Sequence, residues 1–368
     1  MSKNHSETKD ILFMKTALRL AAEGRGQTAP NPMVGALVVK NDRILSSAYH
    51  RGFGQVHAER AALESINEAG CTLYSTLEPC CHYGKTPPCT EIIMARKVAR
   101  VVMATSDPFP AVNGRGAALL RESGIEVCDN VLSDQARSLN RHYFTAQTMG
   151  RPYLAIHAAI SLDGKTTDRN SHSQWVTSAG SRALSHDLRG EFSAILAGAG
   201  TIRQDNPFLT IRSPGWPEKR LFRVILNPAN DLPAEARIFS QQERFPTILF
   251  SSDSNSTNGR RCARHFFIPA ESGRFDLKLI LARLLDMGID SILVEGGGLT
   301  IDAFLQQDLW DEMIVFQSRS LIGGEKSGQI YASGAENLTK ALSFQEMANW
   351  ETSGSLVIRG RRKCLPDW

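Results

Sequence analysis

A histidine, a glutamate and two cysteines carry the clearest chemistry in this chain of 368 residues. His57-Ala58-Glu59 comes first, and Cys80 and Cys89 follow it, each directly after a proline. Three ligands of the His/Cys/Cys type leave the fourth position of a tetrahedral zinc ion open for water. The metal lowers the pKa of that water to about 7, so hydroxide becomes available at neutral pH. Glu59 can then carry the proton of the water to a leaving group, which is the arrangement of zinc deaminases.

Two other interpretations of these residues stay open. Cys81 or His82 would close the tetrahedron and make the zinc site purely structural, or the cysteines would simply be buried core residues. H-A-E and a downstream proline–cysteine pair each stand beside a predicted helix start, which argues against the second. The spacing also departs from that of nucleobase deaminases, because eight residues separate Cys80 from Cys89 where the nucleobase pattern has two.

Alternating helix and strand patterns in the first 130 residues would hold these side chains on an α/β layered domain. We expect helices over residues 10–24, 58–69, 90–99 and 116–123, and strands over 34–39, 71–76 and 101–105. A polar helical linker follows over residues 132–148, and Pro152 then disfavours helix at Arg151. The sequence therefore predicts two domains, residues 1–148 and 149–368.

The second half contains more strand patterns and two glycine-rich turns. Strands are expected over 153–160, 192–197, 223–226, 247–250 and 291–294, with an amphipathic helix over 277–287 and a loop over 251–261. The turns at 197–201 and 295–298 can bring backbone N–H groups close to a phosphate. Neither completes a dinucleotide-binding fingerprint, so tight strand–helix connections fit the spacing equally well.

Composition indicates a folded enzyme of the cytoplasm. Hydrophobic residues make up 42% of the chain and charged residues 22%, which excludes wholesale disorder and a fibrous chain. No signal peptide precedes the first helix, and no apolar run approaches the roughly 20 residues that span a bilayer. Seven cysteines, an odd number, argue against a disulfide framework. The net charge of +4 does not require a nucleic-acid partner, and we interpret the basic run 359–363 as a solvated tail after the last strand.

The motif L-E-P-C-C-H-Y-G-K-T-P-P-C at residues 77–89 closely resembles the deaminase domain of the bifunctional RibD family of riboflavin biosynthesis. N-P-M-V-G at 31–35, the H-A-E triplet, and D-P-F-P at 107–110 with G-R-G at 114–116 fit the same family. The resemblance implies a cytidine-deaminase-like three-layer domain that holds one zinc ion. It also implies hydrolytic deamination of a diaminopyrimidinone that carries a ribosylamino 5′-phosphate.

Carried over by position, the resemblance makes His57, Cys80 and Cys89 the zinc ligands and Glu59 the proton shuttle. It further implies that three side chains hold the substrate, namely Asn31, His50 and Lys85. Their chemistry is suitable, because an amide can pair with a pyrimidine edge and basic groups can meet phosphate or carbonyl oxygen.

The second half resembles the RibD reductase domain through S-L-D-G-K at 161–165, S-Q-W-V-T at 173–177 and G-T-I-R-Q-D-N-P at 200–207. L-T-I-R at 209–212, V-E-G-G at 294–297 and L-I-G-G at 321–324 continue it. The implied fold is dihydrofolate-reductase-like, the cofactor is NADPH, and hydride transfer to C1′ opens the ribosyl group to a ribityl chain. Implied cofactor contacts are Ala159, Trp175, Thr201, Asp205, Gly297 and Gly298. Implied substrate contacts are Ser173, Arg189, Leu209, Arg212 and Glu295. The family also implies a homo-oligomer.

His157 is a serious departure, because the family usually has lysine at this position. Histidine has a shorter reach, and its charge depends on pH. We expect a working but slowed reductase. The alternatives are an active deaminase with a damaged or repurposed reductase domain, and a zinc deaminase of nucleobases or nucleic acid. No role is assigned to Cys71, Cys81, Cys128, Cys262 and Cys364.

Overall fold

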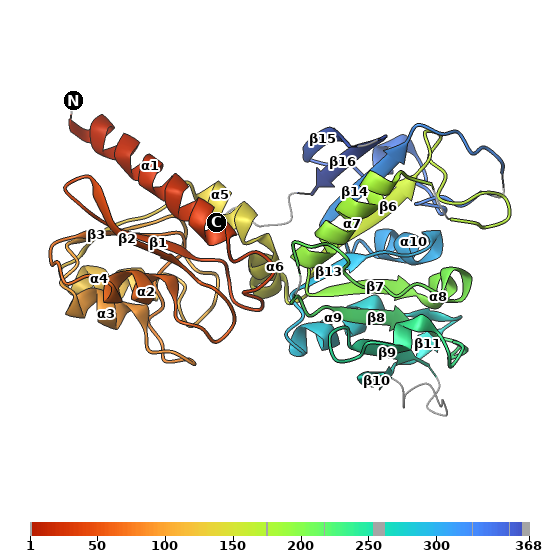
Figure 1. Ribbon diagram of the computed structural model, residues 1–368, viewed down its shortest axis with the longest axis horizontal. Helices are drawn as coiled ribbons and strands as arrows, with labels where there is room; N and C mark the ends of the chain where they lie inside the picture. Colours follow the sequence, from red (N-terminus) through yellow and green to blue (C-terminus); the bar gives the residue numbers. More distant parts are fainter. Residues whose placement is uncertain are drawn as a thin grey trace. The chain divides into compact units, whose positions relative to one another are not determined.

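The computed structural model describes residues 2–173, 176–216, 218–252, 262–325, 327–352 and 354–362. The chain divides into two compact units, Met1–Met149 and Gly150–Trp368 (Figure 1). The predicted cofactor contact Trp175 lies outside the described residues, as do Cys364 and most of the loop predicted over 251–261.

The first unit is built on a five-stranded sheet in the order β2-β1-β3-β4-β5. The strands are β1 (Gly35–Lys40), β2 (Arg43–Tyr49), β3 (Thr72–Ser75), β4 (Arg100–Met103) and β5 (Glu126–Cys128). The helices are α1 (Ser2–Ala22), α2 (Ala58–Glu64), α3 (Cys89–Ala95), α4 (Arg115–Glu122), α5 (Ser133–Leu139) and α6 (Arg141–Met149). β2 and β3 are antiparallel to β1, whereas β3, β4 and β5 are parallel to one another.

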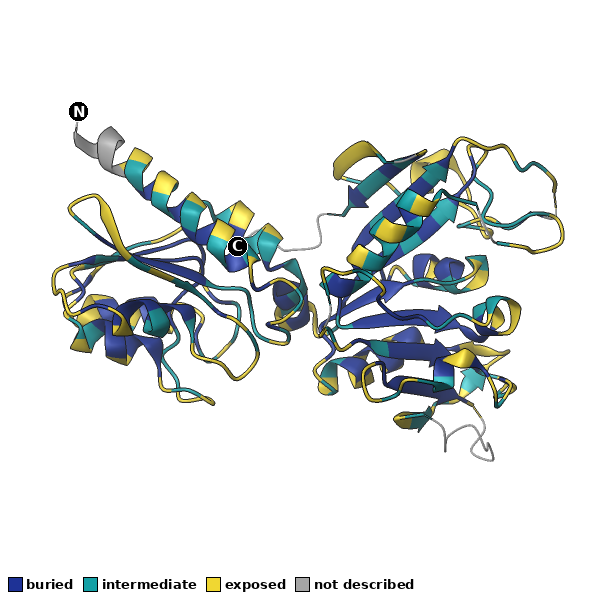
Figure 2. Ribbon diagram, viewed as in Figure 1, coloured by how far each residue is buried: buried dark blue, intermediate teal, exposed yellow. Residues whose placement is uncertain are grey.

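Both faces of this sheet are covered by helices because side chains alternate along a strand. On β1, Ala36 and Val38 pack with α2, α3 and α4 on one face, and Leu37 and Val39 pack with α1 and α5 on the other. Figure 2 shows β1 and β3, which lie between these layers, as mostly buried. The predicted three-layer α/β class is confirmed.

The structure of the first unit differs from the prediction in two respects. The helical linker expected over 132–148 is two helices that break at Asn140, whose buried amide bonds both the N–H and the carbonyl of Met33. The strand β2 was not predicted, because its largely exposed residues form no continuous apolar run.

The second unit is built on a nine-stranded sheet in the order β10-β9-β8-β7-β13-β6-β14-β16-β15. Its strands are β6 (Tyr153–Ile160), β7 (Ala194–Gly198), β8 (Phe222–Leu226), β9 (Thr247–Ser251), β10 (Arg264–Phe267), β13 (Ser291–Val294), β14 (Glu312–Ser318), β15 (Glu346–Thr352) and β16 (Ser355–Arg361). Its helices are α7 (Ala179–Glu191), α8 (Ala199–Asp205), α9 (Leu277–Asp286) and α10 (Gly298–Gln306), and a small ribbon pairs β11 (Ala270–Glu271) with β12 (Arg274–Phe275). The pairs that involve β16 are antiparallel and the other pairs of the sheet are parallel.

The inner parallel strands β7, β8, β9 and β13 are buried on both faces, as continuous apolar runs predict. On β7, Leu196 packs with α9 and α10 on one face, whereas Ile195 and Ala197 pack with α8 on the other. The mixed α/β class of this unit is confirmed as well. No helix among the described residues is long and apolar enough to cross a membrane.

The interpretation of the basic run as a solvated tail is wrong for residues 359–361, which belong to β16. Arg361 Nε lies 2.6 Å from Glu312 Oε1, and Arg359 Nη2 lies 3.1 Å from Glu312 Oε2. Glu312 is fully buried, so these two arginines neutralise a carboxylate inside the sheet. Lys363 lies outside the described residues.

Candidate active sites

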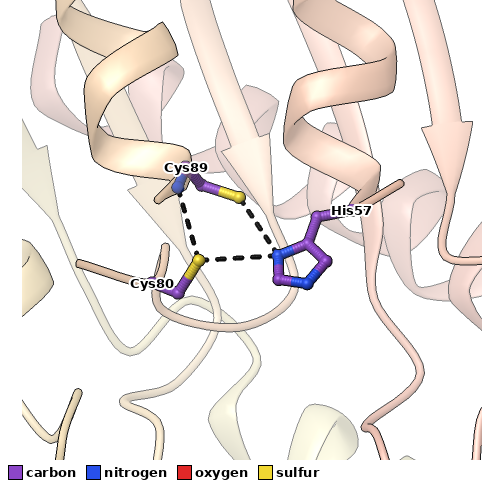
Figure 3. A group of neighbouring side chains, drawn as sticks. All are labelled: His57, Cys80 and Cys89. Atoms are coloured by element: carbon purple, nitrogen blue, oxygen red, sulfur yellow. Dashed lines mark hydrogen bonds between the residues drawn. The ribbon is translucent and has the colours of Figure 1, made fainter. Parts of the chain in front are cut away.

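The three predicted zinc ligands meet at one point of the first unit (Figure 3). His57 is the residue before α2, Cys80 lies in the loop after β3, and Cys89 is the first residue of α3. His57 Nδ1 lies 3.5 Å from Cys80 Sγ and 3.4 Å from Cys89 Sγ. Bond lengths of about 2.0–2.3 Å at a tetrahedral zinc place its ligand atoms roughly 3.5 Å apart. The donor set and its spacing therefore fit zinc.

The electrostatics of the cluster favour the thiolate that zinc requires. Hydrogen bonds from the Cys89 thiol, His57 and the backbone N–H of Cys89 hold the pKa of Cys80 well below its usual range, although burial opposes them. A thiolate is the form of cysteine that binds metal. Cys80 is thus prepared for a metal, whereas the hydrogen bond to Cys80 raises the pKa of Cys89.

The fourth position is not filled by either of the two residues that would have closed it. Cys81 Sγ bonds the carbonyl of Ala111 at 3.6 Å, and the His82 ring packs against Phe109 with centroids 5.4 Å apart. Among the described residues, the group of ligand atoms contains only His57, Cys80 and Cys89. This geometry does not support the purely structural zinc site.

Glu59 lies beside the ligands and is only 4% exposed. Its Oε1 accepts from Ser75 Oγ at 3.3 Å and its Oε2 from Cys89 Sγ at 3.6 Å. Burial raises the pKa of Glu59, against the charge of His57. A carboxyl with a raised pKa can both take and give a proton near neutral pH.

Two of the three predicted substrate contacts of the first unit lie together next to the ligands. Asn31 Nδ2 is 3.2 Å from His50 Nε2, and the rings of His50 and His57 meet edge to face at 5.6 Å. His50 Nδ1 lies 3.2 Å from the carbonyl of Val56, so Nδ1 carries the proton and Nε2 accepts from Asn31. Burial lowers the pKa of His50, which favours this neutral form. Lys85 has a different neighbour, since its Nζ lies 3.7 Å above the ring of Phe53.

Sequence reasoning missed the role of Glu78, although it stands in the L-E-P-C motif. This carboxylate, 2% exposed, accepts hydrogen bonds from the backbone N–H groups of Asp107, Gly114 and Ala117. The start of α4 lies so close to Pro79 that a Cβ on Gly116 would be 2.1 Å from the Pro79 carbonyl oxygen. Glu78 therefore ties the D-P-F-P and G-R-G motifs to the chain two residues before Cys80.

In the second unit, two predicted substrate contacts bind each other. The Arg189 guanidinium forms a two-point ion pair with Glu295, at 2.9 Å from Nε to Oε1 and 2.7 Å from Nη2 to Oε2. Both side chains are largely buried, at 13% and 12% exposure. Burial opposes ionisation of Glu295, but the charge of Arg189 outweighs it and keeps the pKa of Glu295 below its usual range.

His157 joins this pair from the neighbouring strand β6. Its Nδ1 lies 3.8 Å from Glu295 Oε1, and its Nε2 lies 3.2 Å from Ser185 Oγ. Burial lowers the pKa of His157, against the charge of Glu295. The histidine is therefore neutral near pH 7, unlike the lysine that the family usually has here.

His186 links the two predicted substrate arginines, and sequence reasoning missed it. Arg212 Nη2 approaches His186 Nε2 at 2.8 Å, while His186 Nδ1 lies 3.1 Å from the carbonyl of Thr210. Arg189 Nη1 donates to the same carbonyl at 2.6 Å. Burial lowers the pKa of His186 to about 4, so its Nε2 is free to accept from Arg212. The side chain of Leu209, a further predicted substrate contact, is buried in the core.

Two of the predicted cofactor contacts, Thr201 and Gly297, bond each other. Thr201 Oγ1 accepts from Gly297 N at 2.9 Å, so the two glycine-rich turns meet. Nothing lies within 4 Å of where a Cβ on Gly200 would stand, which leaves room for a ligand at the turn. Asp205 is held by Ser173, a predicted substrate contact, at 3.0 Å. Gly298 begins α10, and Ala159 lies on the same strand as His157.

Known protein families and structures match nearly the whole chain. Residues 7–105 match the cytidine and deoxycytidylate deaminase zinc-binding region, and residues 152–358 match the RibD C-terminal domain. The riboflavin biosynthesis protein RibD of Aquifex aeolicus is 41% identical over 356 residues, which is 96% of this chain and 98% of that protein. The RibD protein of Escherichia coli is 35% identical over 350 residues, 92% of this chain and 95% of that protein.

Among solved structures, a diaminohydroxyphosphoribosylaminopyrimidine deaminase/5-amino-6-(5-phosphoribosylamino)uracil reductase from Thermotoga maritima superposes with a TM-score of 0.88. It is 34% identical, with 97% of this chain and 100% of that chain covered. The RibD protein of Acinetobacter baumannii superposes with a TM-score of 0.87 at 31% identity, with 96% and 99% covered.

Proposed function

The chain belongs to the RibD family of riboflavin biosynthesis proteins, and on that premise we propose how its residues divide the work. It is a bifunctional enzyme with a zinc-binding deaminase domain and an NADPH-dependent reductase domain. We assign deamination to residues 1–148 and reduction to residues 149–368. The proposed substrate is 2,5-diamino-6-ribosylamino-4(3H)-pyrimidinone 5′-phosphate, the chemistry expressed in the name of the Thermotoga maritima enzyme.

In the deaminase, His57, Cys80 and Cys89 would hold zinc. When bound, the metal supplies an activated water at its open fourth position. Glu59 carries one proton of that water to the pyrimidine ring and then the second proton to the amino group, which leaves as ammonia. Asn31 and His50 orient the ring, and Lys85 meets an oxygen of the substrate. The observation that carries this assignment is the approach of His57 Nδ1 to both thiols beside the buried Glu59.

In the reductase, NADPH supplies hydride to C1′ of the ribosyl group. The proposed cofactor contacts are Ala159, Trp175, Thr201, Asp205, Gly297 and Gly298. The proposed substrate contacts are Ser173, Arg189, Leu209, Arg212 and Glu295. The hydrogen bond between Thr201 and Gly297 supports the proposed cofactor contacts, because it brings the two glycine-rich turns together. The link through His186 supports a phosphate site, since guanidinium groups pair with phosphate at two points.

We further propose a cytoplasmic homo-oligomer that does not act on nucleic acid. Arg359 and Arg361, from the basic run that motivated the nucleic-acid alternative, both pair with the buried carboxylate of Glu312. Binding to oligonucleotides with a steep salt dependence would contradict this proposal.

A coupled assay tests the function as a whole. Zinc-loaded protein supplied with the pyrimidinone phosphate and NADPH should release ammonia and oxidise NADPH in equal amounts. Ammonia release without NADPH oxidation would indicate that the reductase domain is damaged or repurposed. Absence of both would overturn the substrate assignment.

His157→Lys should raise the turnover of the reductase several-fold. A lysine next to Glu295 stays charged where the buried histidine is neutral, and its longer stem reaches further. NADPH oxidation is measured with the deaminated intermediate as substrate. His265→Lys, on the edge strand β10, is the matched control and should leave the rate unchanged. An unchanged or lower rate in His157→Lys would count against a slowed reductase.

A further inference from the structure

The eight residues inserted between the two thiols hold a group that faces the zinc ligand His57. Thr86 Oγ1 lies 3.2 Å from His57 Nε2, on the side of the ring away from the sulfur atoms. We propose that Thr86 is a positioning residue that orients His57 for zinc. This inference rests on the proposed function in one respect, namely that His57 is a metal ligand.

The hydrogen bond selects the form of His57 that can bind a metal. A zinc ion held by both sulfur atoms would take the lone pair of Nδ1, so the ring proton that Nδ1 shares with Cys80 in the metal-free site could not stay there. The proton then lies on Nε2, where the hydroxyl oxygen of Thr86 accepts it. Outer partners of this kind fix the tautomer and the ring orientation of histidine ligands.

The local chain makes Thr86 a rigid partner. Pro87 and Pro88 follow it and restrict the backbone up to Cys89, which starts α3 and is itself a ligand. The loop is attached at two further points, because Lys85 lies over the ring of Phe53 and the Tyr83 hydroxyl donates to Glu91. Residues 86–89 thus contain one zinc ligand, Cys89, and the hydrogen-bond partner of another ligand, His57.

This placement explains the departure from the nucleobase deaminase spacing. A two-residue connection between the cysteines would have no room for a loop that returns to the far side of the His57 ring. The insert therefore serves the metal site through Thr86, in addition to presenting Lys85.

Thr86→Val removes the acceptor and keeps the shape of the side chain. The expected result is a 10- to 100-fold weaker zinc affinity, the usual loss when an outer partner is removed. Affinity is measured by competition with a chromophoric chelator, on the full-length chain. Thr86→Ser keeps the hydroxyl and should restore affinity to within a few-fold of the wild type. Thr72→Val, half-buried on β3 of the same unit, is the matched control and should bind zinc normally.

Three outcomes separate this inference from the proposed function. Equal zinc affinity of Thr86→Val and the wild type would overturn the role of Thr86. Equal loss in Thr86→Val and Thr86→Ser would also overturn it, because the hydroxyl would then not matter. Failure of the wild type itself to bind zinc would instead overturn the proposed metal site. Reduction of the deaminated intermediate is measured in each variant and should stay constant.

Discussion

Glu59→Gln is expected to slow deamination by about 10²- to 10⁴-fold while zinc stays bound, since a positioned general acid–base group contributes that much. Glutamine has nearly the same shape, so the buried site keeps its packing and its contact with Ser75. An amide cannot take a proton from water, which removes the shuttle. Ammonia release is measured at saturating zinc, and bound metal is measured by atomic absorption.

Glu64→Gln is the control for this prediction, because Glu64 is exposed at the end of the same helix. It should leave both ammonia release and zinc content at the wild-type level. Deamination by Glu59→Gln at more than a tenth of the wild-type rate would contradict the assignment of the proton shuttle. Loss of zinc together with activity would instead make Glu59 part of the metal site.

Arg189→Met should abolish reduction and destabilise the second unit by about 3–5 kcal/mol, the usual result of leaving one partner of a buried ion pair alone. The variant leaves the Glu295 carboxylate without the guanidinium that binds both of its oxygens. Unfolding in urea can be followed by tryptophan fluorescence, because all five tryptophans lie after residue 149. Ammonia release reports on the first unit and should not change.

Two companion variants make the second prediction specific. Arg203→Met breaks an ion pair with Asp231 whose side chains are 45% and 47% exposed, and should cost about 0–1 kcal/mol. Arg189→Met with Glu295→Leu removes both charges, and should recover most of the stability but none of the reduction. Stability of Arg189→Met equal to that of Arg203→Met would contradict the importance of the buried pair. Recovered reduction in the double variant would contradict a role in substrate binding.

The metal site was the part most open to sequence reasoning because its residues are close along the chain. His57, Cys80 and Cys89 lie within 33 residues, and two of them stand at helix starts that the hydrophobic pattern predicts. Local signals of this kind predict the folded structure well, since a helix start depends on the residues next to it. The role of Thr86 was not predicted, because the path of an irregular loop has no such signal.

Strand prediction succeeded where both faces of a strand are buried and failed where a strand is exposed or half-buried along much of its length. β6 and β13 have the bounds that their apolar runs indicate. β2 is largely exposed and was missed, and the basic run in β16 looked like a tail. Such a strand buries too little to impose a continuous hydrophobic pattern, and β16, which lies between β14 and β15, is held by a carboxylate 47 residues away.

The sequence by itself determined the α/β class and the two kinds of chemistry, and it predicted candidate residues for each. Only the tertiary structure decided which charged groups pair. Arg189 and Glu295 are 106 residues apart, and they meet because β13 lies between β7 and β6 in the sheet. The same order brings His157 beside them. Residue types and local spacing specify helices, strands and ligand sets, whereas strand order depends on contacts distant in the chain, which no local pattern contains.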